Sequence, residues 1–397
     1  MRIGLLTYHH VVNIGSVLQT YCAYNLLTQL FPQARVEIID HVPAASESFK
    51  RKLRKVVPGG FFKKEERNEF ARKEVAYERF LRERCAFSPA LGVSDDDAAV
   101  VRKIAEAKYD MVFVGSDTVF QLNGYFGDPI ADKFPPNAYY LPELTGPRKI
   151  GLAASFDPFT AQQVEWNKLA EVAPLLHAFD VVFYRDSTAL EVLRKANMPE
   201  EQMAHIPDPT VLMDITHLVP AQLDIIAQGD RPKAGVAIAD EALRAKIFAL
   251  VKEAGFDVLD YLHPPNKSIG DPSPAEVVGN ALSGYRELDL MVTDRFHGSI
   301  LTLQVSNANL IGIENNATYA EPNSKLRDLY QRLGISDRLV RCGAEGPDPN
   351  SFQQLIKTRS WSRAEMMQRM AGLRMAGLGS IAQALAKFEA SSIATGR

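Results

Sequence analysis

Short apolar runs alternate with segments of helical periodicity along most of this chain, and this rhythm constrains the fold more than any other feature. Residues 2–7 and 35–39 are apolar runs, and residues 16–30 between them carry apolar side chains at helical spacing. After a connecting segment at about residues 214–231, the rhythm restarts at Ala234. Alternating strands and helices predict mostly parallel sheets covered on both faces, and the restart predicts two such domains.

The composition narrows the class of protein. A chain of 397 residues is too long for one ordinary core, and 46% hydrophobic with 23% charged residues is a globular composition. The net charge of −3 argues against a dedicated nucleic-acid binder. Cys22, Cys85 and Cys342 are widely separated, which fits a reducing compartment and predicts no metal site. With neither a signal peptide nor a long apolar run, we expect a cytoplasmic protein.

The most informative stretch is residues 289–304, DLMVTDRFHGSILTLQ. A short apolar run precedes a polar turn with Arg295 and His297, and helical spacing follows from residue 300 to 305. Ligands of doubly wound domains bind at the carboxyl ends of strands, where a helix start attracts anions. The stretch therefore predicts an anion-binding and proton-transfer site. The alternative is a local ion pair between Asp294 and Arg295, with His297 as a capping or core residue.

The first strand-to-helix turn holds a second group of polar residues. Residues 13–16, Asn-Ile-Gly-Ser, lie where the first helix should begin, so they could contact a ligand or simply cap the helix, which is the commoner use. His9, His10 and His263 also lie in loops after apolar runs. These histidines are weaker candidates than His297, since none has an arginine two residues away and a helix start directly behind it.

A basic segment interrupts the rhythm. Residues 50–84 hold thirteen Lys or Arg against six Glu, with aromatic residues interleaved. A solvated helical excursion within residues 45–95 is the favoured interpretation. The alternative is a basic amphipathic surface that touches anionic lipid, which would place the protein at the inner face of the membrane.

Seven short motifs in a fixed order resemble those of the polysaccharide pyruvyl transferase family, over about residues 1–339. Phe120 and Asp157 depart from the family pattern, which commonly has Trp and Gly at these places. The matching stretches are Asn13–Gln19, Val114–Asp117, Ala153–Phe156, Tyr184–Asp186, Asp208–Pro209, Thr293–Gly298 and Ser324–Leu326.

The resemblance implies a fold and a division into domains. We expect an α/β protein with two Rossmann-like domains in a GT-B-like arrangement and a cleft between them. Residues 1–213 would form the acceptor side and residues 232–345 the donor side. Residues 346–397 form a C-terminal helical segment in which residues 361–388 have helical periodicity, and we expect this C-terminal bridging helix to pack back across both domains.

The resemblance also implies a reaction. Pyruvate would pass from phosphoenolpyruvate to two hydroxyls of a sugar as a cyclic ketal, with release of phosphate. The sugar would belong to a polysaccharide or its lipid-linked precursor, and phosphoenolpyruvate would be a substrate, with no cofactor or metal needed. Arg295 suits a phosphate or carboxylate, and His297 can transfer a proton near neutral pH.

Two alternatives to this reaction stay open. One is a glycosyltransferase, with Arg295 on the diphosphate of a nucleotide sugar, and the other is a catalytically silent anion-binding protein of the same fold.

The candidate residues fall into three groups. The catalytic candidates are His297, Asp117 and Asp294; the donor-binding candidates are Arg295, Gly298, Ser299 and Lys325; the acceptor-binding candidates are Asn13, Gly15, Ser16 and Gln19.

Overall fold

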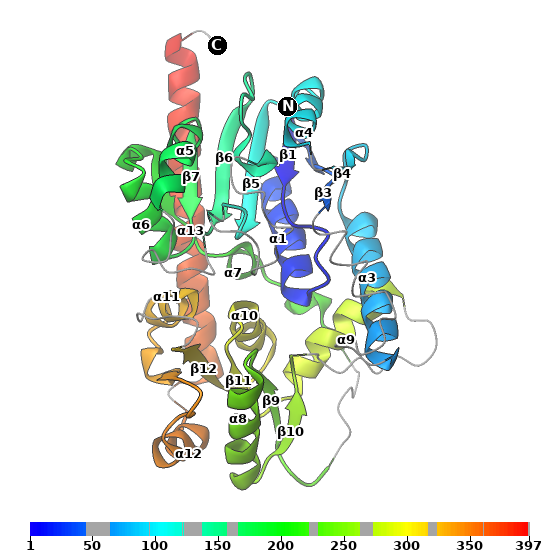
Figure 1. Cartoon of the computed structure of the whole chain (residues 1–397), viewed down its shortest axis with the longest axis vertical. Coiled ribbons are helices and arrows are strands. Elements are labelled where there is room, and N and C mark those ends of the chain that lie inside the picture. Colours follow the sequence, from blue (N-terminus) through cyan, green and yellow to red (C-terminus); the bar gives the residue numbers. More distant parts are fainter. Residues whose placement is uncertain are drawn as a thin grey trace. The chain divides into compact units, whose positions relative to one another are not determined.

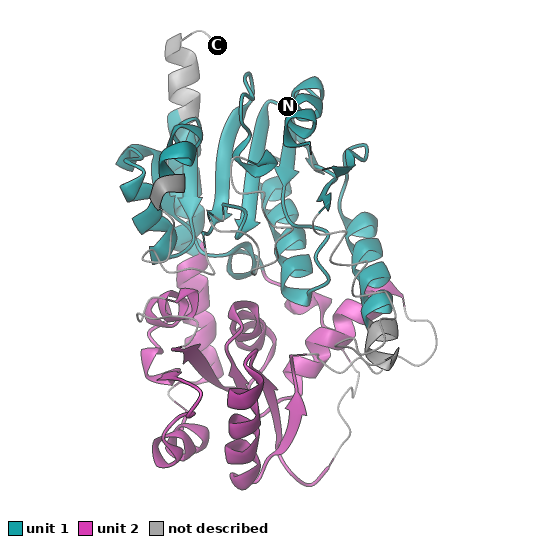
Figure 2. Ribbon diagram, in the orientation of Figure 1, with its two compact units in different colours: residues 1–213, 375–397 teal, residues 214–374 magenta. Residues whose placement is uncertain are grey.

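The computed structural model of the chain divides into two compact units (Figures 1 and 2). Unit 1 comprises residues 1–213 and 375–397, and unit 2 comprises residues 214–374. The residues that the structure describes are 1–44, 64–94, 96–120, 122, 137–156, 166–221, 229–262, 273–316, 324–359 and 361–395.

Unit 1 is built on a six-stranded parallel sheet with the strand order β2-β1-β5-β6-β7-β8. The chain passes from β1 to β2 on one side and then returns to the other side of β1 for β5, which makes a topological switch point between β1 and β5. A separate parallel pair joins β3 and β4. The strands are β1 (Arg2–Leu6), β2 (Arg35–Ile38), β3 (His41–Pro43), β4 (Gly92–Ser94), β5 (Met111–Asp117), β6 (Arg148–Ala154), β7 (Val181–Tyr184) and β8 (Met203–His205).

Helices cover both faces of this sheet. Successive strand residues point to opposite faces, and both sets are buried. Val112 and Val114 of β5 belong to a buried cluster with residues of α4, α5 and α6. Phe113, between them, lies 6.0 Å from the ring of Phe31 at the end of α1. The helices of unit 1 are α1 (Ile14–Leu30), α3 (Lys64–Arg84), α4 (Asp97–Glu106), α5 (Trp166–His177), α6 (Ser187–Lys195) and α7 (Pro209–Leu212), with 3-10 turns η3 (Ala138–Tyr140) and η4 (Glu200–Gln202).

Unit 2 is built on a five-stranded parallel sheet with the strand order β10-β9-β11-β12-β13. Its first strand is flanked by the second on one side and the third on the other, so its switch point lies between β9 and β11. The strands are β9 (Lys233–Ala237), β10 (Asp257–Asp260), β11 (Leu290–Thr293), β12 (Asn309–Asn315) and β13 (Leu339–Cys342).

The helices of unit 2 also lie on both faces of their sheet. Val236 and Val292 share a buried cluster with residues of α8 and α12. On the opposite face, a Cβ at Gly312 would lie 2.7 Å from Tyr330 of α11, so this strand needs glycine for the helix to approach. The elements are α8 (Glu241–Glu253), α9 (Pro274–Arg286), α10 (Phe296–Val305), α11 (Lys325–Arg332) and α12 (Pro349–Lys357), with 3-10 turns η5 (Thr216–Leu218) and η6 (Ser336–Arg338), and α13 (Arg363–Thr395), which contributes residues to both units.

The basic segment contains one long helix, α3, over residues 64–84. Residues 45–63 and 95 of the predicted excursion lie outside the described part of the chain. Arg82 pairs with Glu78 at 3.1 Å and with Asp40 at 3.0 Å, and the guanidinium of Arg84 lies over the ring of Phe80. A contact with anionic lipid stays a prediction. Within the described ranges, no helix is long and apolar enough to cross a bilayer.

Phe120, one of the two departures from the family motifs, fills the core of unit 1. Its ring is fully buried and lies 5.1, 5.7 and 5.4 Å from the rings of Tyr140, Phe156 and Phe179. The phenyl ring therefore packs in an aromatic cluster just beyond the end of β5. Asp157, the other departure, lies outside the described residues.

Gly115, near the carboxyl end of β5, should tolerate no side chain. Gly115 and Gly146 both have positive φ, at 127° and 104°, where a residue with a Cβ is strained by about 1–3 kcal/mol. A Cβ at Gly115 would also overlap the carbonyl oxygen of Leu152, whereas nothing lies within 4 Å of a Cβ at Gly146. We expect Gly115→Ala to lower the urea midpoint of unfolding well below that of Gly146→Ala. Equal midpoints would show that the sheet relaxes around the added methyl group.

Candidate active site

The switch point of unit 2 places residues 293–295 beside the end of β9. The backbone carbonyl of Ala237 accepts hydrogen bonds from the Asp294 backbone N–H at 3.1 Å and from the Thr293 hydroxyl at 3.2 Å. The backbone N–H of Ala239 donates to Asp294 Oδ2 at 2.8 Å. These bonds hold the turn after β11 at the carboxyl edge of the sheet, where ligands of such folds bind.

Arg295 projects from this turn with 49% of its side chain exposed. Its Nε lies 3.2 Å from Asp294 Oδ1, and its backbone N–H donates to the Thr293 hydroxyl at 2.9 Å. Burial raises the pKa of Asp294, although Arg295 opposes that shift. Asp294 therefore fixes one edge of the guanidinium, and the exposed remainder can meet an anion.

Helix α10 begins directly after Arg295. Arg295 is its N-cap residue and makes no side-chain capping bond to the first turn. Gly298 in that turn packs closely, because a Cβ there would lie 2.9 Å from the Thr293 hydroxyl. His297 is half-buried, with its ring edge-on to Phe296 at 5.4 Å. A cation, a helix start and an imidazole thus occupy consecutive positions at one strand end.

Ser299 and Lys325 occupy different surroundings. The hydroxyl of Ser299 is fully buried and lies 3.1 Å from the hydroxyl of Tyr330, so its side chain faces the interior of unit 2. Lys325 is the first residue of α11 and is half-buried. It follows β12, the strand beside β11, so it belongs to the same edge of the sheet as Arg295.

The corresponding edge of unit 1 holds a buried ionic network around Arg185. Nη1 of Arg185 donates to Asp208 Oδ2 at 2.7 Å. The carboxylates of Asp117 and Asp186 lie 3.9 and 3.8 Å from the same guanidinium. Burial alone would lower the pKa of Arg185, but the three carboxylates raise it above its ordinary value. Arg185 is 2% exposed at its side chain, so this cation is neutralised within the protein and closed to solvent.

Among the acceptor candidates, Gln19 joins this network. Gln19 is buried and donates through Nε2 to Asp208 Oδ2 at 2.6 Å. Asn13 is exposed and caps α1, because its Oδ1 accepts from the backbone N–H groups of Gly15 and Ser16, which are both buried. Capping is therefore one role that Asn13 fills. Asp117 is more open, with 20% of its side chain exposed at the end of β5.

The importance of Arg185 and Asp208 as a pair could not be found from their positions in the chain. Both lie in motifs of the predicted family, but 23 residues separate Arg185 from Asp208, and 189 residues separate Asp208 from its other partner, Gln19. Asp208 accepts two further bonds at Oδ1, from the backbone N–H and the hydroxyl of Thr210. An Asp-Pro-Thr triplet is a recognisable signal for such a cap, but it does not reveal the partner arginine.

A cavity of about 210 Å³ opens in unit 1 beyond the ends of β1 and β2. Its lining includes His9 and His10, whereas His263 lies outside the described residues.

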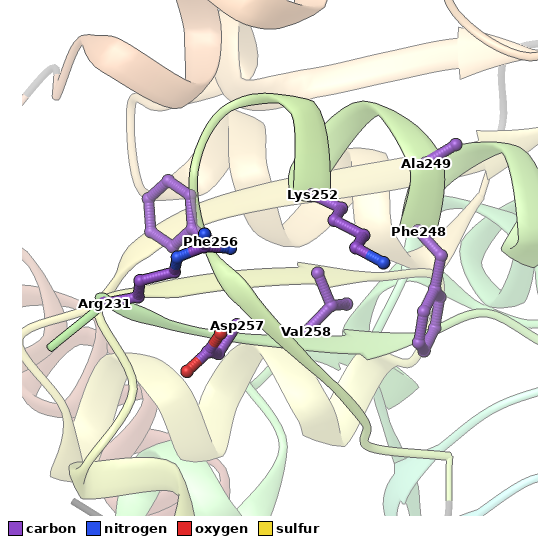
Figure 3. Close-up of a pocket in the computed structure, with 7 residues that line it drawn as sticks. All are labelled: Arg231, Phe248, Ala249, Lys252, Phe256, Asp257 and Val258. Atoms are coloured by element: carbon purple, nitrogen blue, oxygen red, sulfur yellow. The ribbon is translucent and has the colours of Figure 1, made fainter. Parts of the chain in front are cut away.

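A second hollow, of about 270 Å³, lies in unit 2 (Figure 3). Its lining side chains come from Arg231, the end of α8 and the start of β10, so it lies at the amino edge of the sheet, away from Arg295. Across the described ranges, no group of three or more His, Cys, Asp or Glu residues could hold a metal ion.

Removing Asp208 should destabilise unit 1 strongly. Asp208→Ala leaves a buried guanidinium without its closest carboxylate, which typically costs about 3–5 kcal/mol. The control is Glu200→Ala, since Glu200 pairs with Arg194 at 3.0 Å with both side chains more than half exposed. Loss of such an exposed pair costs at most about 1 kcal/mol. Chemical denaturation measures both free energies of unfolding, and similar losses would contradict a buried network.

Solved structures of other proteins share this fold across nearly the whole chain. A protein from Listeria monocytogenes, assigned as a UDP-N-acetylglucosamine 2-epimerase, matches with a TM-score of 0.52 and 10% identity over 98% of this chain and 96% of its own. The Neisseria meningitidis UDP-GlcNAc 2-epimerase bound to UDP-GlcNAc matches with a TM-score of 0.52 and 12% identity, over 98% and 100%. At such identities the likeness concerns the fold alone. It confirms the predicted class, an α/β protein with two parallel sheets, a GT-B-like fold and a long C-terminal helix.

A search of curated protein sequences gave no match to this chain. The family model described as polysaccharide pyruvyl transferase matches residues 13–306, which is well over half of the chain. The match begins at Asn13 and extends past the motif that holds Arg295 and His297. The resemblance seen in the sequence is thus confirmed, and the chain belongs to the polysaccharide pyruvyl transferase family.

Proposed function

We propose that this protein transfers pyruvate from phosphoenolpyruvate to two hydroxyls of a sugar as a cyclic ketal and releases phosphate. The sugar would be part of a polysaccharide or of its lipid-linked precursor. The observation that carries the proposal is the half-exposed guanidinium of Arg295 beside the start of α10, at the switch point of unit 2. Family membership supports the same donor and acceptor classes.

The donor is a compact anion, and unit 2 supplies groups that suit it. Arg295 offers N–H donors on the side of its guanidinium away from Asp294, in a fork that matches a phosphate or carboxylate. The first turn of α10 adds backbone N–H groups and the positive end of the helix dipole. Gly298 contributes through its backbone, and Lys325 is a second cation at the same edge. Ser299 takes a packing role in this proposal because its hydroxyl faces Tyr330.

The reaction moves two hydroxyl protons. Protonation of the methylene carbon of phosphoenolpyruvate makes the methyl group of pyruvate and leaves an electron-poor carbon that the first sugar hydroxyl attacks. The bond from this carbon to the phosphate oxygen then breaks, and the second hydroxyl completes the ketal. One hydroxyl proton in effect balances the proton given to carbon, and the other leaves with phosphate. We assign the proton delivery to His297, which follows Arg295 by two residues in the first turn of α10.

Unit 1 supplies the groups that suit a sugar acceptor. Asp117 is the candidate for accepting a hydroxyl proton, since its carboxylate is partly exposed at the carboxyl end of β5. Asn13 is exposed next to the same switch point. Gly15, Ser16 and Gln19 are buried, so we assign them supporting roles. Gly15 and Ser16 form the first turn of α1, and Gln19 holds Asp208 by a hydrogen bond. Asp294 likewise positions Arg295.

Removing the guanidinium of Arg295 should weaken donor binding. Loss of a charged hydrogen bond costs about 1.5–3 kcal/mol, which is roughly tenfold to over a hundredfold in affinity. Arg231→Ala is the control, because Arg231 is an exposed arginine of the same unit at the opposite edge of the sheet. We expect calorimetry with phosphoenolpyruvate to show the loss for Arg295→Ala and an unchanged affinity for Arg231→Ala. Equal affinities for both variants would rule out Arg295 as the anchor.

Replacing His297 should affect turnover and leave donor binding intact. A positioned general acid typically contributes about 10²–10⁴-fold in rate. We therefore expect His297→Gln, which keeps a polar side chain of similar reach, to fold, to bind phosphoenolpyruvate and to lose at least about a hundredfold in turnover. Phosphate release in the presence of a glycan acceptor measures the rate. A folded variant with a near-parental rate would assign the proton transfer to another group.

A further inference from the structure

The cavity in unit 1 is enclosed by parts of the chain that are far apart in sequence. The turn after β1, the end of β2, strands β3 and β4 and helix α3 all contribute to its wall. Its volume of about 210 Å³ is below the roughly 300–1,000 Å³ of pockets for drug-sized ligands, so it suits one small ring. Beside the hydroxyl of Tyr77, the polar side chains in its lining are those of His9, His10, Asp40, Glu74, Glu78 and Arg82.

Several contacts hold Asp40 in place within this lining. Its side chain is 7% exposed, and its Oδ2 accepts from Arg82 at 3.0 Å. His9 Nε2 lies 3.6 Å from Asp40 Oδ1. The backbone N–H of Asp40 donates to the hydroxyl of Ser88, and the Arg82 guanidinium lies over the ring of Phe87 at 4.6 Å. Each of these contacts limits the motion of the carboxylate or of its partner, so the lining is preorganised.

The imidazole of His9 is held neutral. Burial lowers its pKa to about 4, against the opposing effect of Asp40. A neutral imidazole can donate at one nitrogen and accept at the other, as a hydroxyl-bearing ligand requires. The ring of His10 lies edge-on to His9 at 5.6 Å and to Tyr8 at 5.9 Å. The wall therefore presents carboxylate, imidazole and guanidinium groups next to aromatic rings.

The charges of the lining select against anions. Asp40, Glu74 and Glu78 bring three carboxylates, and Arg82 is the one guanidinium among the lining residues. Phosphoenolpyruvate and nucleotides carry several negative charges, so this wall would repel them. The hydroxyls of a neutral sugar, in contrast, donate to carboxylates and accept from guanidinium and imidazole.

We propose that this cavity binds a neutral sugar ring and is the acceptor subsite of the transfer reaction, an assignment that rests on the proposed function. Asp40 and Glu78 would accept from sugar hydroxyls, and Arg82 would donate to them. The apolar part of the lining, including Val42 and Val93, would cover the C–H face of the ring.

Two exposed valines allow a matched test. Val93 lines the cavity and is 51% exposed, whereas Val75 on α3 is 57% exposed and is not among the lining residues. Val93→Trp should fill the cavity and leave every polar group in place, and Val75→Trp adds the same ring to the surface nearby. Binding of the methyl glycosides of glucose, galactose, mannose and N-acetylglucosamine is measured by saturation-transfer NMR. We expect at least one to bind wild type and Val75→Trp equally and to bind Val93→Trp at least about tenfold more weakly.

Other outcomes separate this inference from the proposed function. If wild type binds none of the four glycosides, if Val93→Trp binds as Val75→Trp does, or if glucose 6-phosphate binds more tightly than methyl glucoside, the cavity assignment is wrong. Phosphate release from phosphoenolpyruvate with a glycan acceptor is measured on the same wild-type protein. Glycoside binding without phosphate release contradicts the proposed function and leaves the cavity as a sugar site. Phosphate release that Val93→Trp leaves unchanged contradicts only the cavity assignment.

Discussion

Parallel pairing brings the carboxyl ends of all strands in a sheet to one edge, and the chemistry of this protein depends on that constraint. Both sheets are parallel throughout, and both are buried on two faces by helices. Most strand positions are therefore apolar, and the candidate polar side chains gather at the strand ends and in the turns that follow them. Each switch point adds an opening between two turns that run to opposite sides of the sheet.

The two units use arginine at these turns in opposite ways. Arg185 in unit 1 is 2% exposed and is surrounded by three carboxylates, so its charge stabilises the fold around Gln19 and Asp208. Arg295 in unit 2 is 49% exposed and has one close carboxylate, that of Asp294. A guanidinium that three carboxylates already neutralise attracts a further anion only weakly. A guanidinium that is half exposed to solvent next to a helix start attracts an anion strongly. This contrast is why we place the donor on unit 2.

The sequence predicted the elements whose side chains alternate clearly, and it was weakest at the sheet edges and for distant pairs. The strand before Arg295 was expected, but α10 begins at Phe296, four residues before the helical spacing at Ile300. Glycine and polar residues fill its first turn, so the apolar pattern starts late. Strand β13 was missed because it is an edge strand whose first three residues are only half-buried.

The candidate site shows the same limit. Arg295, His297 and Gly298 are neighbours in sequence, and their placement at one strand end followed from the local pattern. The bonds from Asp208 to Arg185 and Gln19, and the lining that joins His9, Asp40 and Arg82, link residues that only the tertiary fold brings together. A single sequence carries no signal for such pairs, because each member has an ordinary local use as a cap or a surface charge.

We propose that the wild-type protein consumes phosphoenolpyruvate to make a sugar ketal. The most direct measurement incubates it with phosphoenolpyruvate, nucleotide sugars and a panel of glycans, follows the release of phosphate and of nucleotides, and analyses the glycans by mass spectrometry. We expect phosphate release that requires a glycan, with one pyruvate ketal formed for each phosphate. Release of a nucleotide from a nucleotide sugar, with phosphoenolpyruvate left intact in every mixture, would contradict it and would favour a glycosyltransferase.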